Sequence, residues 1–171
     1  ERAHLHFEVG LWLGPRFQNW YDSRRFDTSN DHQSYNGMNI VGTNVWALLQ
    51  SLRSGETSSV VEYFASERTA ILVTVWESSI PDLLQVNPEL MINDLLPMDH
   101  AGWRIAFSAS GLPLRFEALP ASERVGKKRL SVEIVDEALA KSDPCAALIL
   151  SGAIGGATSR LSSLLDRLFV D

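Results

Sequence analysis

Residues 103–118 contain the pattern that most restricts how this 171-residue chain can fold. Buried-type side chains alternate with others through Trp103-Arg104-Ile105-Ala106-Phe107, Ser110-Gly111 supplies a turn, and Leu112 to Ala118 returns as a partner segment. Alternation places successive side chains on opposite faces of a strand, and a short glycine-containing turn joins antiparallel neighbours. The sequence therefore predicts a β-hairpin and, with it, an antiparallel sheet.

Further strands and short helices are expected around this hairpin. Residues 69–76 are rich in β-branched side chains, residues 129–136 alternate, and residues 146–150 are typical of a buried strand. Short helices are predicted within residues 16–25, at 60–66, and twice within 80–96, the second starting at Asn87-Pro88. A further helix is expected from Asn44 as N-cap to Gly55 as the left-handed C-terminal residue. The last is expected around Leu161–Leu168, with Thr158 or Ser159 as cap. These elements predict an α+β fold.

The chain divides most naturally near residue 54. Residues 1–13 are typical of a strand interrupted near Gly10, and residues 27–39 form a long polar loop. The polar stretch Ser54 to Ser59 is a plausible linker. We therefore expect the end of a mainly-β sheet in residues 1–54, followed in residues 55–171 by a small α+β module of about five strands and short helices.

The tripeptide His4-Leu5-His6 is the main chemical feature. In an alternating strand both imidazoles project from one face, and Glu8 falls on that same face. Two imidazoles held side by side suit Zn²⁺, which neutral imidazole binds at about 2.0–2.1 Å. Spacing alone, however, favours an ordinary exposed histidine pair over a metal site.

The surrounding residues add context to the histidine pair. The segment Arg2-Ala3-His4-Leu5-His6-Phe7-Glu8 resembles the closing motif of the lysostaphin-type zinc metallopeptidases, which mostly cut peptidoglycan cross-bridges or stem peptides. The likeness continues through roughly residue 50. It implies Zn²⁺ as cofactor, His6 as a zinc ligand, His4 as the catalytic acid/base, a peptidoglycan peptide as substrate, and a periplasmic or extracellular location.

The chain departs from that family in one respect. The family takes two further zinc ligands from an upstream His-x-x-x-Asp, whereas here Asn36 follows His32 at that spacing and Arg104 follows His100. The chain also begins with Glu1. We therefore expect a C-terminal fragment, inactive alone. The alternatives are a non-catalytic cell-wall binding or regulatory scaffold, or a partner-binding module in residues 55–171 with a chance histidine match.

Other polar candidates have ordinary explanations beside functional ones. Glu8 orients an imidazole from outside the metal's ligand set or is simply solvated, and neither is favoured. His32, in the loop, lines a cleft or bonds to its neighbours, and the second is favoured. His100 is interpreted as a turn residue.

Four early aromatic residues either line a groove for glycan or peptide or pack into the core, and irregular spacing favours the core. They are Trp12, Phe17, Trp20 and Tyr21.

Composition excludes several classes of protein. A net charge of −6 and a pI near 5.2 argue against non-specific nucleic-acid binding, which depends on clustered cations. No apolar run reaches the roughly 20 residues of a membrane-spanning helix, and no signal peptide is visible. The single Cys145 excludes an intrachain disulfide. The sequence does not indicate an oligomeric state.

Overall fold

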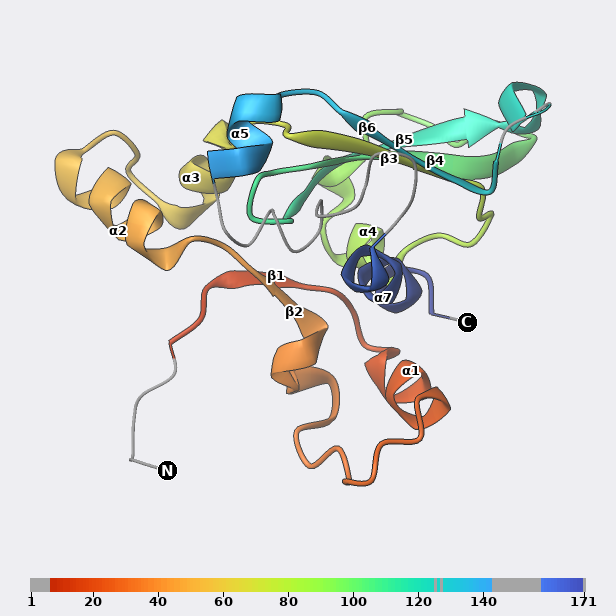
Figure 1. Ribbon diagram of the computed structural model, residues 1–171, viewed down its shortest axis with the longest axis horizontal. Coiled ribbons are helices and arrows are strands. Elements are labelled where there is room, and N and C mark those ends of the chain that lie inside the picture. Colours follow the sequence, from red (N-terminus) through yellow and green to blue (C-terminus); the bar gives the residue numbers. More distant parts are fainter. Residues whose placement is uncertain (1–6, 125, 127, 143–157, 171) are drawn as a thin grey trace.

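The protein folds around a four-stranded antiparallel sheet accompanied by a two-stranded one, so the predicted α+β class is confirmed (Figure 1). The structure, a computed structural model, describes residues 7–124, 126, 128–142 and 158–170. The strand predicted at 146–150 and Cys145 lie outside these residues.

The large sheet has the strand order β5-β4-β3-β6. Its strands are β3 (Ile71–Val75), β4 (His100–Phe107), β5 (Pro113–Pro120) and β6 (Leu130–Ile134). The predicted hairpin is confirmed, with Ile105 opposite Phe116 across β4 and β5. Strand β3 lies between β4 and β6 and pairs Val73 with both Ile105 and Val132.

The small sheet joins β1 (Gly10–Trp12) to β2 (Ile40–Gly42). The strand predicted over residues 1–13 is thus wrong in extent for the described residues, because residues 7–9 are not in a strand. Its partner β2 is only three residues long. The last hydrogen bond between the two segments is donated by the backbone N–H of Thr43 to the Val9 carbonyl at 2.9 Å. Gly10 is needed because a Cβ there would lie 2.2 Å from the Val41 carbonyl oxygen.

Helices and single turns connect the strands. The helices are α1 (Phe17–Ser23), α2 (Val45–Ser54), α3 (Val60–Ser66), α4 (Asp82–Val86), α5 (Glu137–Ser142) and α7 (Ser159–Leu168), with 3₁₀ turns η1 (Gln33–Tyr35), η2 (Gly37–Asn39), η3 (Pro88–Leu90) and η4 (Ala121–Arg124). The predicted caps are confirmed: Asn44 accepts from the Ala47 N–H at 3.1 Å, Gly55 has φ of 76°, and Thr158 caps α7. Helix α5 was not predicted.

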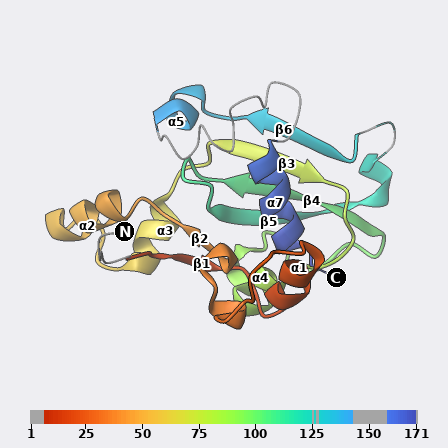
Figure 2. The ribbon, with the colours of Figure 1, turned by 60° about the horizontal axis from the view of Figure 1, so that its bottom comes forward.

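The core lies on one face of the large sheet. Figures 1 and 2 place α1, α4 and α7 on the same side, with α7 lying across the strands. Buried leucines of α7 pack there against alternate residues of β3: Leu161, Leu164, Leu165, Leu168, Ile71, Val73 and Val75. The opposite face carries Thr74, Arg104 and Glu117, which share a register row. A one-sided antiparallel sheet of this kind alternates apolar and polar side chains.

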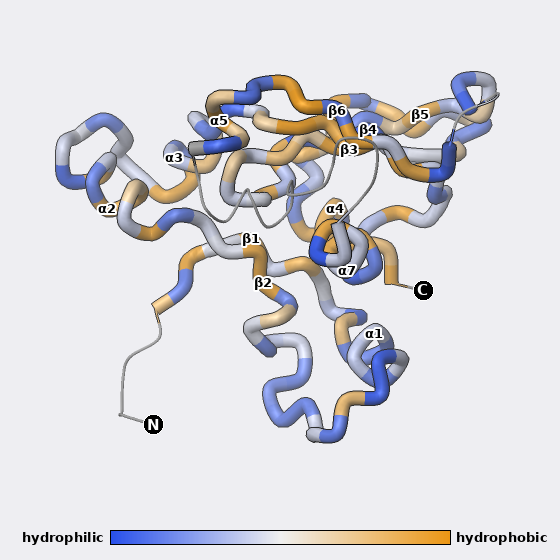
Figure 3. Tube along the Cα trace, viewed as in Figure 1, coloured by the Kyte–Doolittle hydropathy of each residue, from blue (hydrophilic) through white to orange (hydrophobic). Residues whose placement is uncertain are grey.

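Residues on both sides of the predicted boundary near residue 54 share this core. Leu13, between β1 and α1, is buried in the same cluster as the sheet and α7. The division into 1–54 and 55–171 itself stays a prediction. Figure 3 shows that the segment between α1 and β2 is mainly hydrophilic, whereas hydrophobic residues concentrate in the strands. None of the helices within the described ranges is long and apolar enough to cross a membrane.

Candidate functional site

The two histidines of the predicted metal site, His4 and His6, lie outside the described residues, so their roles stay predictions. The structure describes the chain from Phe7 onward, and backbone pairing with β2 holds it within the next few residues. The Val9 carbonyl accepts from the Thr43 N–H, and Gly10 pairs with Gly42. The segment that follows the motif is therefore anchored from the third residue after His6.

Glu8 lies beside the turn η2. Its carboxylate Oε2 is 3.7 Å from the position that a Cβ at Gly37 would occupy, which is ordinary van der Waals distance. The side chain is exposed. The structure therefore brings Glu8 to the polar loop 27–39, while its predicted action on an imidazole stays untested.

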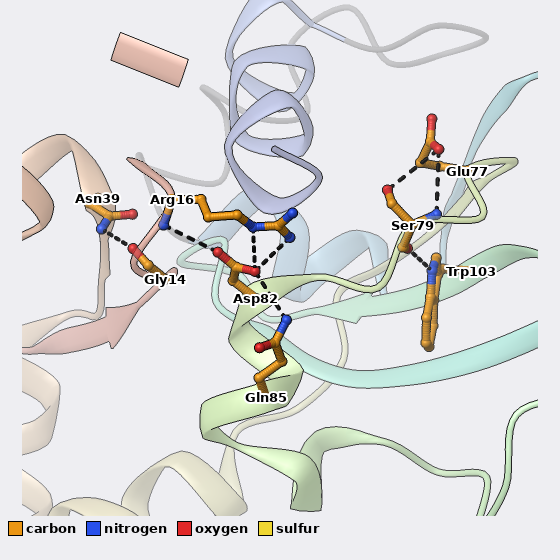
Figure 4. A network of polar contacts seen from close by, with 8 residues as sticks. All are labelled: Gly14, Arg16, Asn39, Glu77, Ser79, Asp82, Gln85 and Trp103. Carbon is orange, nitrogen blue, oxygen red and sulfur yellow. Dashed lines mark hydrogen bonds and ion pairs between the residues drawn. The ribbon is translucent and has the colours of Figure 1, made fainter. Parts of the chain in front are cut away.

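Side-chain amides order the loop 27–39. Asn39 is 1% exposed and donates from Nδ2 to the Gly14 carbonyl at 2.7 Å (Figure 4). The same Nδ2 donates to the Ser34 carbonyl, also at 2.7 Å. Asn36 donates to the Asn30 side chain at 2.9 Å, and Asn30 donates to the Gln33 carbonyl at 2.9 Å. Asparagine side chains commonly take over backbone hydrogen bonds in turns. This long loop is therefore an ordered structure.

The loop presents one aromatic side chain to solvent. The Tyr35 ring stacks on Trp12 with centroids 6.3 Å apart and an interplanar angle of 18°, yet Tyr35 is 81% exposed. The Trp12 Nε1 donates to the Ser34 carbonyl at 2.7 Å, which holds the indole in place. No sequence motif singled out Tyr35. The available signal was an aromatic residue in a loop with polar residues on both sides.

The predicted core role of the early aromatic residues is confirmed for three of the four. Phe17, Trp20 and Tyr21 are buried, whereas Trp12 is half-buried. The aromatic groove is therefore wrong for Phe17 and Tyr21, which α1 turns into the core. Trp20 is buried as well but also lines a pocket.

His32 lies on the same turn as Tyr35. It precedes η1, its carbonyl accepts from the Tyr35 N–H at 2.9 Å, and its side chain is exposed. His32 and Tyr35 thus lie on one loop, and Trp12 of β1 stacks against Tyr35. A contact between His32 and substrate stays a prediction.

An ion pair fixes the chain between β1 and α1 to the large module. Asp82, buried at the start of α4, accepts from Arg16 Nε at 2.7 Å and from the Arg16 backbone N–H at 3.2 Å (Figure 4). Gly14, with φ of 152°, lies against it, because a Cβ there would meet the Asp82 Cβ at 2.3 Å. The loop 27–39 is therefore connected to the core by the contacts of Asn39, Gly14 and Asp82.

A pocket of about 550 Å³ lies between α1, α7 and the ends of β3 and β6. Two ion pairs lie in its walls, Arg24 with Asp166 and Arg129 with Glu77, the latter at 3.4 Å. Trp20 also lines it, and its buried Nε1 has no hydrogen-bond partner in the described part of the chain. These two ion pairs include all four charged residues of the lining, so the lining carries no net charge.

His100 is the first residue of β4, so the predicted turn is wrong at this position. It pairs with Pro120 because β5 runs to that residue. The ring packs edge-on against Trp103 with centroids 4.6 Å apart, and both ring nitrogens are buried without a partner among the described residues. Burial is the larger influence and lowers the pKa of His100, while the backbone of Leu119 acts in the opposite direction.

The described residues include no group of three or more His, Cys, Asp or Glu side chains placed to hold a metal ion. Comparison with protein-family models, with curated proteins and with solved structures found no match for this chain.

Proposed function

We propose that this chain is part of a zinc-dependent metalloendopeptidase that acts on bacterial cell-wall peptidoglycan. The observation that carries the proposal is the segment Arg2 to Glu8, with its His-x-His pair and the following Phe-Glu. Two features of the fold support it. The backbone is anchored to β2 from Val9 onward, and an ordered loop lies beside Glu8.

The two histidines of the motif have different chemical roles in this proposal. His6 offers a neutral ring nitrogen to the metal, and His4 carries a proton to the leaving amine. His6 would hold the Zn²⁺, which would supply Lewis-acid chemistry for activating a water and polarising the scissile carbonyl. His6 alone does not complete a site of three protein ligands, so the two remaining ligands would be the His and Asp of a His-x-x-x-Asp outside these 171 residues.

The test uses the complete gene product. We expect its sequence to contain His-x-x-x-Asp before residue 1, and the purified protein to hold one zinc per chain. His6→Ala should abolish zinc binding and activity, because it removes a ligand. His4→Ala should keep the zinc and lose turnover of a peptidoglycan peptide, because only the proton carrier is removed.

His32→Ala is the matched control for zinc content, since it deletes an exposed imidazole from the loop. Unchanged zinc content and activity in both motif variants would overturn the assignment. Absence of the upstream His-x-x-x-Asp would favour the non-catalytic cell-wall scaffold instead. The 171-residue chain alone should bind zinc weakly and show no peptidase activity, and tight zinc binding with chelator-sensitive activity would contradict that expectation.

A further inference from the structure

Tyr35 combines high exposure with a fixed position, an unusual arrangement for an aromatic ring. The side chain is 81% exposed, but one face of its ring is stacked on Trp12. Trp12 in turn is held by its hydrogen bond to the Ser34 carbonyl. The outer part of the tyrosine ring is therefore presented to solvent in a defined orientation.

The loop that carries this ring is ordered from several sides. Asn39 ties it to Gly14 and Ser34, and Asn36 and Asn30 bond across it. From α7, the Arg167 guanidinium donates to the Met38 carbonyl. The entropic cost of ordering the loop when a ligand stacks on Tyr35 is therefore small, which favours affinity.

The residues next to Tyr35 in the sequence are polar, and the exposed Met38 follows three positions later. The neighbours along the turn are His32, Gln33, Ser34 and Asn36, which offer an imidazole, amides and a hydroxyl. A site for an apolar protein partner would place aliphatic side chains around an aromatic anchor. A sugar ring matches this surface better, because its C–H face lies flat on an aromatic ring while its hydroxyl groups bond to flanking polar groups.

We propose that Trp12 and Tyr35 form a carbohydrate-stacking platform that takes a pyranose ring of a glycan chain. The platform lies on the same loop as Gly37, where an added Cβ would lie 3.7 Å from the Glu8 carboxylate. The choice of N-acetylhexosamine as the sugar rests on the proposed function, since peptidoglycan combines such glycan strands with peptides. The binding itself requires neither zinc nor catalysis.

The test is a titration of the 171-residue chain with tetra-N-acetylchitotetraose in the presence of EDTA. Binding is followed by the Trp12 indole N–H resonance in ¹⁵N NMR spectra. We expect a saturable shift of that resonance. Tyr35→Ala should weaken binding about tenfold, the loss of one aromatic contact of about 1.4 kcal/mol, whereas Tyr35→Phe keeps the ring face and should stay within about twofold.

Trp46→Ala is the matched control, because Trp46 is also an exposed aromatic, 71% accessible, but lies on α2. It should leave the titration unchanged. Absence of a saturable shift, or equal affinity in Tyr35→Ala, would overturn the platform. Stronger binding of a sugar-free stem peptide at the same resonance would overturn the glycan assignment. Zinc measurements are separate, so the hydrolase proposal and the platform can fail independently.

Discussion

Single residues decide whether the loop 27–39 stays on the core. Asn39 is the central one, because its amide group joins the loop to Gly14 and is almost fully buried. We expect Asn39→Asp to lower the free energy of unfolding at pH 7 by about 2–4 kcal/mol, because a carboxylate would face two carbonyl oxygens without donors. Denaturant unfolding measures this loss.

Asn44→Asp is the matched control for that substitution. Asn44 caps α2 with its side-chain oxygen, and aspartate accepts the same N–H equally well. Its unfolding midpoint should stay close to that of the wild type. Similar losses in both variants would contradict the role given to the Asn39 amide.

His100 makes the stability of the fold depend on pH. Its folded-state pKa lies below the ordinary value near 6.5 because burial disfavours the charged ring. As the pH falls through 6.5, the unfolded chain takes up a proton before the folded chain does, so the free energy of unfolding decreases. Above about pH 7.5 the residue is neutral in both states and contributes no slope.

His100→Phe should therefore flatten the stability profile between about pH 6.5 and the lowered pKa, while the aromatic contact with Trp103 is kept. His32→Gln, which removes an exposed imidazole, should retain the wild-type slope. Unfolding curves measured from pH 8 to pH 5 give the comparison. Identical slopes in wild type and His100→Phe would show that His100 titrates normally.

Among the elements, the β1–β2 pair most directly holds the backbone that follows the His-x-His motif. Gly10 and Gly42 face each other across this pair, but their surroundings differ. A Cβ at Gly10 would lie 2.2 Å from a backbone oxygen, whereas one at Gly42 would lie 3.8 Å from the nearest, an ordinary contact. The sequence showed a glycine at each position but not this difference.

We expect Gly10→Ala to separate β1 from β2 and to cost about 1–3 kcal/mol of stability, as overpacking does. Gly42→Ala should be nearly neutral. Amide hydrogen exchange at Thr43, whose N–H donates to Val9, reports the pairing and should accelerate only in Gly10→Ala. Faster exchange in both variants, or in neither, would contradict the packing described for this pair.

Across the whole molecule, local patterns predicted the elements better than their partners. Alternation located the β4–β5 hairpin, and side-chain chemistry located the caps at Asn44 and Thr158, because these signals are short-range. The place of β6 beside β3 and the start of β4 at His100 depend on pairings distant in sequence. Burial on one face of the sheet decides those pairings, and no local pattern encodes it.

The residues of the candidate site also differ in whether a local sequence pattern predicts them. The histidine pair was found by its motif, whereas the position of Tyr35 depends on the folded loop, in which Asn39 bonds to Ser34 and Asn36 bonds to Asn30. Such contacts depend on the folded loop, so a sequence pattern shows only that the loop is polar. The platform therefore became visible only with the structure.

The most direct test of the account is anomalous X-ray diffraction at the zinc edge from crystals of the complete gene product. The account predicts one zinc peak at about 2.0–2.1 Å from a ring nitrogen of His6, with the upstream histidine and aspartate completing the site. A crystal of zinc-loaded protein with the metal bound elsewhere, or with no peak at His6, would contradict it.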